Sequence, residues 1–334
     1  MRLLIHDRCW QRIATPARAV APGLEVLVLD ENGRFTLDGA PADPASAPAD
    51  LAFASTDVFQ HGPVRDFMIA CLKSPDLTWF QSGAAGFDHP VFATLADKGL
   101  TLTNSDASAV AIAEFVLARV LEGFHGDGRR REAQAAQRWE KSGFREIHGS
   151  HWLIVGMGRI GGEIARRAQA FGARVTGVRR HPDGSEPADR MLRPAELPDA
   201  LPDADVIVLA AGANRDSEGL VDTAFLSALK DDAVLVNIAR GALVDEAALL
   251  AGLDDGRPAT AILDVFANEP LPADNPLWTH RRVRLSAHCA AYGSGFAARG
   301  DRVFLDNLAR FVAGEPLANQ VDAVALAASV PGNR

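Results

Sequence analysis

The chain of 334 residues lacks long apolar runs and has little cysteine. No run reaches the roughly 18 apolar residues of a transmembrane helix. The stretch Met1–Trp10 carries charged residues, and its apolar run is too short for a signal peptide. The three cysteines are odd in number and too far apart for a disulfide framework or a zinc motif. Reduced thiols are typical of the cytoplasm, so we expect a soluble cytoplasmic protein with no metal site and no membrane association. The cysteines are Cys9, Cys71 and Cys289.

Positive charge is in the minority. Lysine and arginine together number 34 against 43 acidic residues, which gives a net charge of -9. Proteins that bind nucleic acids usually present a basic face to the phosphates. The composition therefore predicts no nucleic-acid partner.

Apolar residues make up 48% of the chain, which is enough for a large core and, at this length, for about two domains. Strand-like and helix-like segments alternate, as is typical of parallel α/β architecture. The first predicted strands are Leu3–Ile5, Val26–Leu29, Leu51–Ala54, Leu77–Gln81 and Leu100–Thr103, and the first predicted helices are Arg8–Val20 and Val64–Leu72. Between them, Asp38–Asp50 is a loop by composition.

A first boundary is expected near Asn104, where Asp106 is placed to cap a helix from Ala107 to about Phe124. This helix is apolar on several sides, so it is either deeply buried or part of a subunit contact. The next predicted strands are Trp152–Val155, Arg174–Val178, Val206–Ala210, Val234–Ile238, Thr260–Asp264 and Val283–Ser286. Predicted helices are Ile160–Phe171, Thr223–Lys230, Asp245–Leu253 and Gly295–Ala313. Six such strands are sufficient for a complete dinucleotide-binding sheet.

A glycine motif, Gly156-Met157-Gly158-Arg159-Ile160-Gly161, fits G-x-G-x-x-G between a predicted strand and a predicted helix. Its glycines allow a tight turn, a close approach of the backbone to a pyrophosphate, and close helix–strand packing. The helix that follows would offer free N–H groups to the phosphates. A purely structural glycine turn is the alternative, but the context favours a dinucleotide site.

Two arginines, Arg179 and Arg180, follow the second strand of this unit. NAD-binding sites normally carry a carboxylate there for the ribose 2′-hydroxyl, but no carboxylate occurs before Asp183. Guanidinium groups are suited to a 2′-phosphate. The pattern favours NADP (NADPH) over NAD, although a solvated basic loop would look the same.

Charged side chains also follow the later strands. Arg240 comes after Val234–Ile238, Glu269 follows Asp264 past the next strand, and His288 follows the last. Ligands of open α/β sheets bind at the carboxyl ends of strands, so we expect these side chains to converge. A lone histidine or an Arg–Glu pair is more often structural, but the order and spacing of all three favour catalysis.

The segment from Gly156 to Ala291 resembles the D-isomer-specific 2-hydroxyacid dehydrogenases, in particular glyoxylate/hydroxypyruvate reductases. The resemblance implies that Arg240, Glu269 and His288 are catalytic. It implies that the cofactor contacts include Gly156, Gly158, Arg159, Ile160, Gly161, Ala239 and Asp264, the last through the nicotinamide carboxamide. Departures from the family pattern are Ala287 in place of a proline, Ala211–Ala213 in a loop beside the cofactor, and the segment Arg145–His151.

A looser resemblance covers Gln81–His89. This segment is similar to the family loop whose backbone N–H groups receive the substrate carboxylate, and it implies Ala85 and Gly86 as donors, with Arg240 as a further substrate contact. The family fold implies a Rossmann dinucleotide-binding domain at residues 104–289. That domain would be inserted in a flavodoxin-like substrate domain formed by residues 1–103 plus 290–334.

The implied reaction is hydride transfer from the nicotinamide to the keto carbon of a small 2-keto acid. His288 would donate the proton, Glu269 would favour the imidazolium form, and Arg240 would bind the carboxylate and polarise the carbonyl. We therefore expect an NADPH-dependent reductase that forms a D-2-hydroxy acid, and a homodimer. A reductase of a larger 2-keto acid and a non-catalytic nucleotide-sensing protein are the alternatives.

Overall fold

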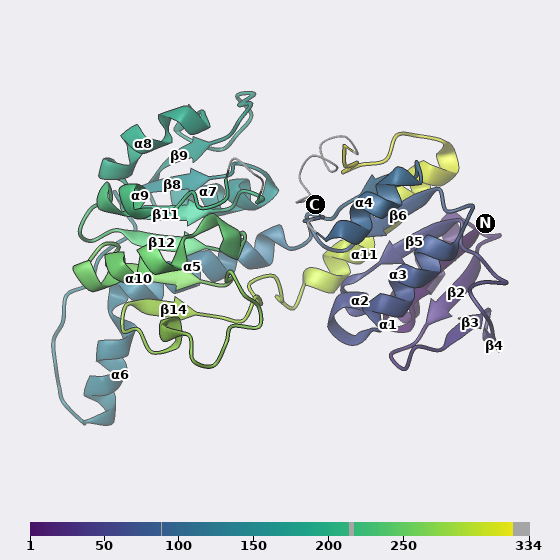
Figure 1. Ribbon diagram of the computed structural model, residues 1–334, viewed down its shortest axis with the longest axis horizontal. Coiled ribbons are helices and arrows are strands. Elements are labelled where there is room, and N and C mark those ends of the chain that lie inside the picture. Colours follow the sequence, from purple (N-terminus) through teal and green to yellow (C-terminus); the bar gives the residue numbers. More distant parts are fainter. Residues whose placement is uncertain (88, 214–216, 323–334) are drawn as a thin grey trace. The chain divides into compact units, whose positions relative to one another are not determined.

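The computed structural model describes residues 1–87, 89–213 and 217–322, which form two compact units (Figure 1). The first unit comprises Met1–Ser108 and the segment that starts at Ser294, and the second is Ala109–Gly293. Each unit has its own seven-stranded sheet covered by helices. Among the described residues, no helix is both long enough and apolar enough to cross a membrane.

The sheet of the first unit has the strand order β4-β3-β2-β1-β5-β6-β7. Its strands are β1 (Arg2–His6), β2 (Glu25–Leu29), β3 (Phe35–Leu37), β4 (Ala40–Pro41), β5 (Leu51–Ala54), β6 (Trp79–Ser82) and β7 (Thr101–Thr103). Five of them pair in parallel in the order of a flavodoxin-like sheet, and β3 and β4 form an antiparallel hairpin at one edge. The predicted loop Asp38–Asp50 was therefore wrong at β4, since a strand of two residues leaves no periodic pattern.

Helices cover both faces of this sheet because its strands are apolar on both sides. The helices are α1 (Asp7–Val20), α2 (Thr56–His61), α3 (Val64–Lys73), α4 (Pro90–Asp97) and α11 (Phe296–Ala313). Side chains of α1 and α11 share one core cluster with the sheet, and those of α3 and α4 share another. The returning helix α11 thus completes the first unit after the chain has left the second.

Phe304 is the main anchor of α11. Its ring is fully buried and stacks on Phe53 of β5 at a centroid distance of 4.3 Å and on Trp79 of β6 at 5.4 Å. Stacked aromatic pairs contribute beyond the apolar area they bury. This cluster joins a helix near the end of the chain to strands near its beginning.

The sheet of the second unit is parallel throughout, in the order β10-β9-β8-β11-β12-β13-β14. Its strands are β8 (His151–Val155), β9 (Arg174–Val178), β10 (Arg190–Leu192), β11 (Val206–Leu209), β12 (Val234–Asn237), β13 (Thr260–Leu263) and β14 (Val283–Leu285). This is the Rossmann order with one strand added at the end. The sequence predicted six strands and missed β10, a three-residue edge strand with an exposed arginine.

Helices of the second unit again lie on both faces. They are α5 (Ala109–His125), α6 (Asp127–Ala135), α7 (Arg159–Ala170), α8 (Leu197–Ala200), α9 (Thr223–Ser227) and α10 (Glu246–Asp255), with short 3-10 turns η1 (Pro194–Glu196), η2 (Leu201–Asp203), η3 (Gly241–Leu243) and η4 (Pro276–Trp278). The helix predicted from Ala107 begins at Ala109, and α5 packs with α7 in one core cluster of the sheet. One face of the helix is therefore buried in the core, and the subunit contact stays a prediction.

Truncation of Phe304 tests the role of α11. We expect Phe304→Ala to lower the stability of the first unit by about 3–5 kcal/mol, because it removes a buried aromatic ring and leaves a cavity. The measurement is the midpoint of urea unfolding followed by tryptophan fluorescence, with Val312→Ala, an exposed position on the same helix, as the control. Equal midpoints for the two variants would contradict the anchoring role.

Candidate active site

The chemically important residues of the second unit lie in loops that follow β8, β9, β12, β13 and β14. All these strands run parallel, so their carboxyl ends share one edge of the sheet. Gly156 follows β8 directly, and Arg240, Asp264 and His288 follow the three strands at the other side of the sheet. The ligand site of an open α/β sheet is expected at this edge.

The turn after β8 can only be made by glycine. Gly156 has φ +106°, and a Cβ there would lie 2.4 Å from the backbone N of Ala211. A Cβ on Gly161 would lie 2.1 Å from the Gly156 carbonyl oxygen. Gly158, by contrast, is exposed at the start of α7, and a Cβ there would meet no atom within 4 Å. The turn therefore leaves open space at the amino end of α7, which begins with Arg159 and Ile160, and this fits a dinucleotide pyrophosphate.

The loop after β9 carries acid as well as arginine. The Arg179 guanidinium donates through Nη1 to Glu186 at 2.8 Å and to Asp183 at 3.3 Å. Arg180 is exposed and forms no ion pair or side-chain hydrogen bond with the described residues. Both arginines were predicted from the sequence, but the carboxylate of Glu186 was missed because it lies seven residues beyond Arg179.

His288 and Glu269 form a hydrogen-bonded pair. The His288 Nδ1 lies 2.7 Å from Glu269 Oε2, while Glu269 Oε1 accepts a hydrogen bond from the backbone N–H of Phe266 at 3.0 Å. The imidazole is about half exposed, with 53% of its side-chain surface accessible. One ring nitrogen is thus fixed by a carboxylate, and the ring remains open to a ligand.

The loop that carries His288 is held in place by hydrogen bonds to Asp264. The Asp264 carboxylate is buried and accepts hydrogen bonds from Ser286 Oγ at 2.5 Å and from the backbone N–H groups of Cys289 and Ala290, each at 3.0 Å. The Asp264 carbonyl accepts from the His288 N–H at 2.8 Å. These bonds hold His288 at φ +49°, a left-handed conformation that side chains rarely adopt. The alanine at position 287 therefore sits in a turn that Asp264 holds from the neighbouring strand.

Arg240 follows a turn that is stabilised by Asn237. The buried Asn237 side chain accepts from the N–H of Ala239 at 3.1 Å and donates to the carbonyl of Arg240 at 2.9 Å. The Arg240 guanidinium donates through Nη1 to the Ala239 carbonyl at 2.6 Å. From the sequence, Asn237 was only one residue of the predicted strand Val234–Ile238, and its positioning role comes from the structure.

Gly241 brings two of these loops together. A Cβ on Gly241 would lie 1.9 Å from the Phe266 carbonyl carbon and 2.3 Å from the N of Ala267. The turn that carries Arg240 therefore packs directly on the backbone that donates to Glu269. Only glycine permits this approach.

Ala85 and Gly86 lie in the first unit, in the loop after β6. The Ala85 carbonyl accepts a hydrogen bond from Asn104 Nδ2 at 2.9 Å, and the Ala84 carbonyl accepts from the N–H of Ser105 at 3.2 Å. Within the described part of the chain, the N–H groups of Ala85 and Gly86 have no hydrogen-bond acceptor. The loop is thus held in place through its carbonyl groups. The N–H groups of Ala85 and Gly86 remain available, within the described residues, to donate to a ligand.

Comparison with known proteins agrees with this arrangement. Residues 117–290 match the family model of the D-isomer specific 2-hydroxyacid dehydrogenase NAD-binding domain. A hydroxypyruvate reductase of Blautia hydrogenotrophica is 28% identical over 73% of this chain and 79% of its own length. A D-lactate dehydrogenase of Treponema pallidum is 33% identical over 77% of this chain and 81% of its own length.

A solved structure matches nearly the whole chain. The D-isomer specific 2-hydroxyacid dehydrogenase from Xanthobacter autotrophicus Py2, in complex with NADPH and MES, has a TM-score of 0.78 and 27% identity and covers 97% of this chain and 99% of its own. This chain belongs to the D-isomer-specific 2-hydroxyacid dehydrogenase family. It is therefore an NAD(P)-dependent oxidoreductase with a Rossmann domain, as the sequence predicted.

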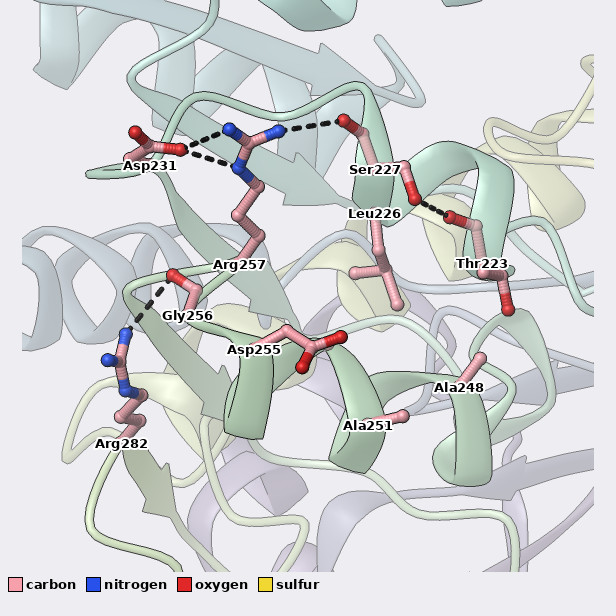
Figure 2. Close-up of a pocket in the computed structure, with 11 residues that line it drawn as sticks. Thr223, Leu226, Ser227, Asp231, Ala248, Ala251, Asp255, Gly256, Arg257 and Arg282 are labelled. Atoms are coloured by element: carbon pink, nitrogen blue, oxygen red, sulfur yellow. Dashed lines mark hydrogen bonds and ion pairs between the residues drawn. The ribbon is translucent and has the colours of Figure 1, made fainter.

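A surface hollow of the dehydrogenase lies away from this edge, between α9 and α10 (Figure 2). Its volume is about 630 Å³, and its lining includes Arg257 and Arg282 from loops that precede β13 and β14. Both guanidiniums already have partners, since Arg257 pairs with Asp231 at 2.5 Å and Arg282 donates to the Gly256 carbonyl at 3.1 Å. The hollow thus lies at the amino ends of the strands and contains none of the residues described above.

Substitution of Gly241 tests the packing of the two loops. We expect Gly241→Ala to push the Phe266 backbone away and so move Glu269 relative to His288, with a loss of turnover of about a hundredfold or more. The measurement is steady-state kinetics together with a thermal melt. The control is Gly123→Ala on α5, where a Cβ meets nothing within 4 Å. Normal turnover in Gly241→Ala would show that the close approach has no functional importance.

Proposed function

We propose that the dehydrogenase uses NADPH to reduce a small 2-keto acid of the glyoxylate/hydroxypyruvate type to the D-2-hydroxy acid. The observation that carries the proposal is the His288–Glu269 pair at 2.7 Å, at the sheet edge where the Arg240 turn also lies. The hydroxypyruvate reductase of Blautia hydrogenotrophica supports the substrate class, and the NADPH complex of the Xanthobacter protein supports the cofactor.

Each residue has a distinct proposed role. A bound nicotinamide supplies the hydride. His288 donates the proton to the developing alkoxide through the ring nitrogen that Glu269 does not hold. Glu269 fixes the orientation of the ring through Nδ1, and Arg240 binds the substrate carboxylate and polarises the carbonyl. The pyrophosphate would be held by Gly156, Gly158, Arg159, Ile160 and Gly161. Ala239 and Asp264 would be further cofactor contacts, and Arg179 and Arg180 would bind the 2′-phosphate.

We also propose that the first unit is the substrate domain. Among the described residues, nothing accepts a hydrogen bond from the N–H groups of Ala85 and Gly86, and backbone donors of this kind are suited to a carboxylate. In the first unit, a small acid would be recognised by these donors through its carboxylate.

A cofactor and substrate panel tests the reaction. We expect NADPH oxidation with glyoxylate or hydroxypyruvate to exceed NADH oxidation and to exceed activity with pyruvate or phenylpyruvate. A pyruvate preference would place the enzyme with the Treponema relative, and a phenylpyruvate preference would indicate a larger pocket. Tight NADPH binding with no oxidation of it by any acid of the panel would instead support a nucleotide sensor.

Variants of the proposed catalytic groups complete this test. We expect His288→Ala and Arg240→Ala to lower turnover by about 10²–10⁴-fold, as is typical for loss of a general acid or a carbonyl-polarising group. NADPH affinity, measured by nucleotide fluorescence, should stay near that of the unmodified enzyme. A large loss of NADPH affinity would mean that these two residues bind the cofactor and that the roles are misassigned.

The dehydrogenase is further proposed to be a homodimer. The connection after α6 carries Trp139, which is 95% exposed, and Phe144, which is 55% exposed. Figure 1 shows α6 extending from the body of the second unit. A large aromatic side chain that contacts so little of its own chain is typical of a subunit interface.

Substitution of Trp139 tests this interface. We expect Trp139→Ala to weaken dimerisation at least about tenfold in analytical ultracentrifugation, since interface tryptophans are often binding hot spots. Phe171→Ala is the control, because Phe171 is exposed at the end of α7. A monomeric unmodified protein, or a dimer unaffected by Trp139→Ala, would contradict the proposal.

A further inference from the structure

The loop after β9 lies next to the turn that is proposed to hold the pyrophosphate. The Val178 carbonyl accepts hydrogen bonds from the N–H groups of Gly156 at 2.9 Å and of Met157 at 3.3 Å. Farther along the loop, Pro187 packs on α7, since its Cγ lies 3.6 Å from the Cβ position of Gly162. Residues 179–187 therefore run beside the amino end of α7, where the fold places the adenosine ribose.

Glu186 is fixed within this loop. Its Oε1 accepts from the N–H of Asp183 at 3.1 Å, and its Oε2 accepts from the N–H of Gly184 at 2.9 Å. Only 2% of its side-chain surface is exposed. Burial opposes its ionisation, but the hydrogen bonds from Arg179 and from the backbone outweigh this effect and lower the pKa of Glu186. The carboxylate is therefore charged at neutral pH and held in place next to Arg179.

The two arginines of the loop consequently differ. Arg179 pairs with two carboxylates, whereas Arg180 is exposed and pairs with no described residue. A 2′-phosphate that approaches Arg179 also meets the negative charge of Glu186, which cannot turn away without losing its backbone hydrogen bonds. A carboxylate is moreover the group that accepts a hydrogen bond from the 2′-hydroxyl of NAD.

We propose that Glu186 sets the cofactor preference of this dehydrogenase: it neutralises Arg179, weakens NADPH binding relative to NADH, and leaves Arg180 as the guanidinium that favours the 2′-phosphate. This inference rests on the proposed use of NADPH. It adds a specificity-determining residue of opposite charge to the two arginines. The enzyme is accordingly expected to accept NADH as well, with NADPH bound less tightly than two free guanidiniums would allow.

Direct binding of the two cofactors tests the role of Glu186. We expect Glu186→Gln to tighten NADPH binding about tenfold, because the charge that opposes the phosphate is removed, and to change NADH binding by less than about twofold. Glutamine keeps one acceptor oxygen, which can still accept from the N–H of Asp183, but its amide nitrogen cannot accept from the N–H of Gly184. A thermal melt of the variant therefore accompanies the titration and checks that the fold is retained. The measurement is titration of nucleotide fluorescence in the unmodified protein and each variant, and the gain should shrink as added salt screens the charges.

Glu163→Gln is the matched control. Its substitution makes the same change in net charge as Glu186→Gln. Glu163, however, lies on α7 and pairs with Arg166 and Arg167 rather than with Arg179. It should alter the affinity for either cofactor by less than about twofold, since the charge that is removed is paired with arginines of α7 and not with an arginine of the loop. Equal tightening in both variants would overturn the inference in favour of a general charge effect.

Other outcomes separate this inference from the proposed function. Weaker NADPH binding in Glu186→Gln would show that Glu186 orients Arg179 for the phosphate, which overturns the inference. If Arg180→Ala weakens NADPH binding while Glu186→Gln changes nothing, the use of NADPH stands and only the inference fails. If the unmodified protein binds NADH alone and neither variant affects it, both fail.

Discussion

The hydrogen bonds of Asp264 join two neighbouring strand ends at the edge where the proposed chemistry takes place. The carboxylate and carbonyl of this residue, which directly follows β13, accept hydrogen bonds from four groups of the segment 286–290 after β14. A buried carboxylate is costly unless its oxygens accept hydrogen bonds, and here the loop provides the donors. The same hydrogen bonds fix the left-handed conformation of the loop at His288.

The other features of the edge depend on the same parallel alignment. Glu269 reaches His288 because its loop leaves β13, the strand next to β14, and the Arg240 turn approaches from β12 on the other side of β13. Gly241 allows this approach by having no side chain. Backbone contacts therefore help to hold together three loops that are distant in sequence.

Charge is balanced differently on the cofactor side of this sheet. The loop after β9 combines two arginines with Asp183 and Glu186, and Arg179 pairs with both carboxylates. Recognition of an anionic ligand by such a loop depends on competition between the phosphate and carboxylates of the protein. Residue types alone do not show this competition, because it depends on which charges are in contact.

Much of the architecture could be predicted from the sequence. Apolar strands such as Val206–Leu209 are buried on both faces, so their pattern is unambiguous, and the glycine motif after β8 has a conformation that no other residue can adopt. The family and the NAD(P)-dependent oxidoreductase class were also predicted correctly. The short strands β4 and β10 were missed, since edge strands of two or three residues are formed by pairing with a neighbour rather than by local preference.

The proposed active site, like the fold, has features that the sequence predicts and features that only the tertiary structure shows. The order of Arg240, Glu269 and His288 along the chain is a property of the sequence, and with a parallel sheet it assigns them to one edge. The tertiary structure decided three further features. They are the hydrogen bonds from Asp264 to the loop of His288, the turn stabilised by Asn237, and the pairing of Arg179 with Glu186. The physical reason is that these are hydrogen bonds between specific atoms, whose formation depends on distances and directions that exist only after the strands have aligned.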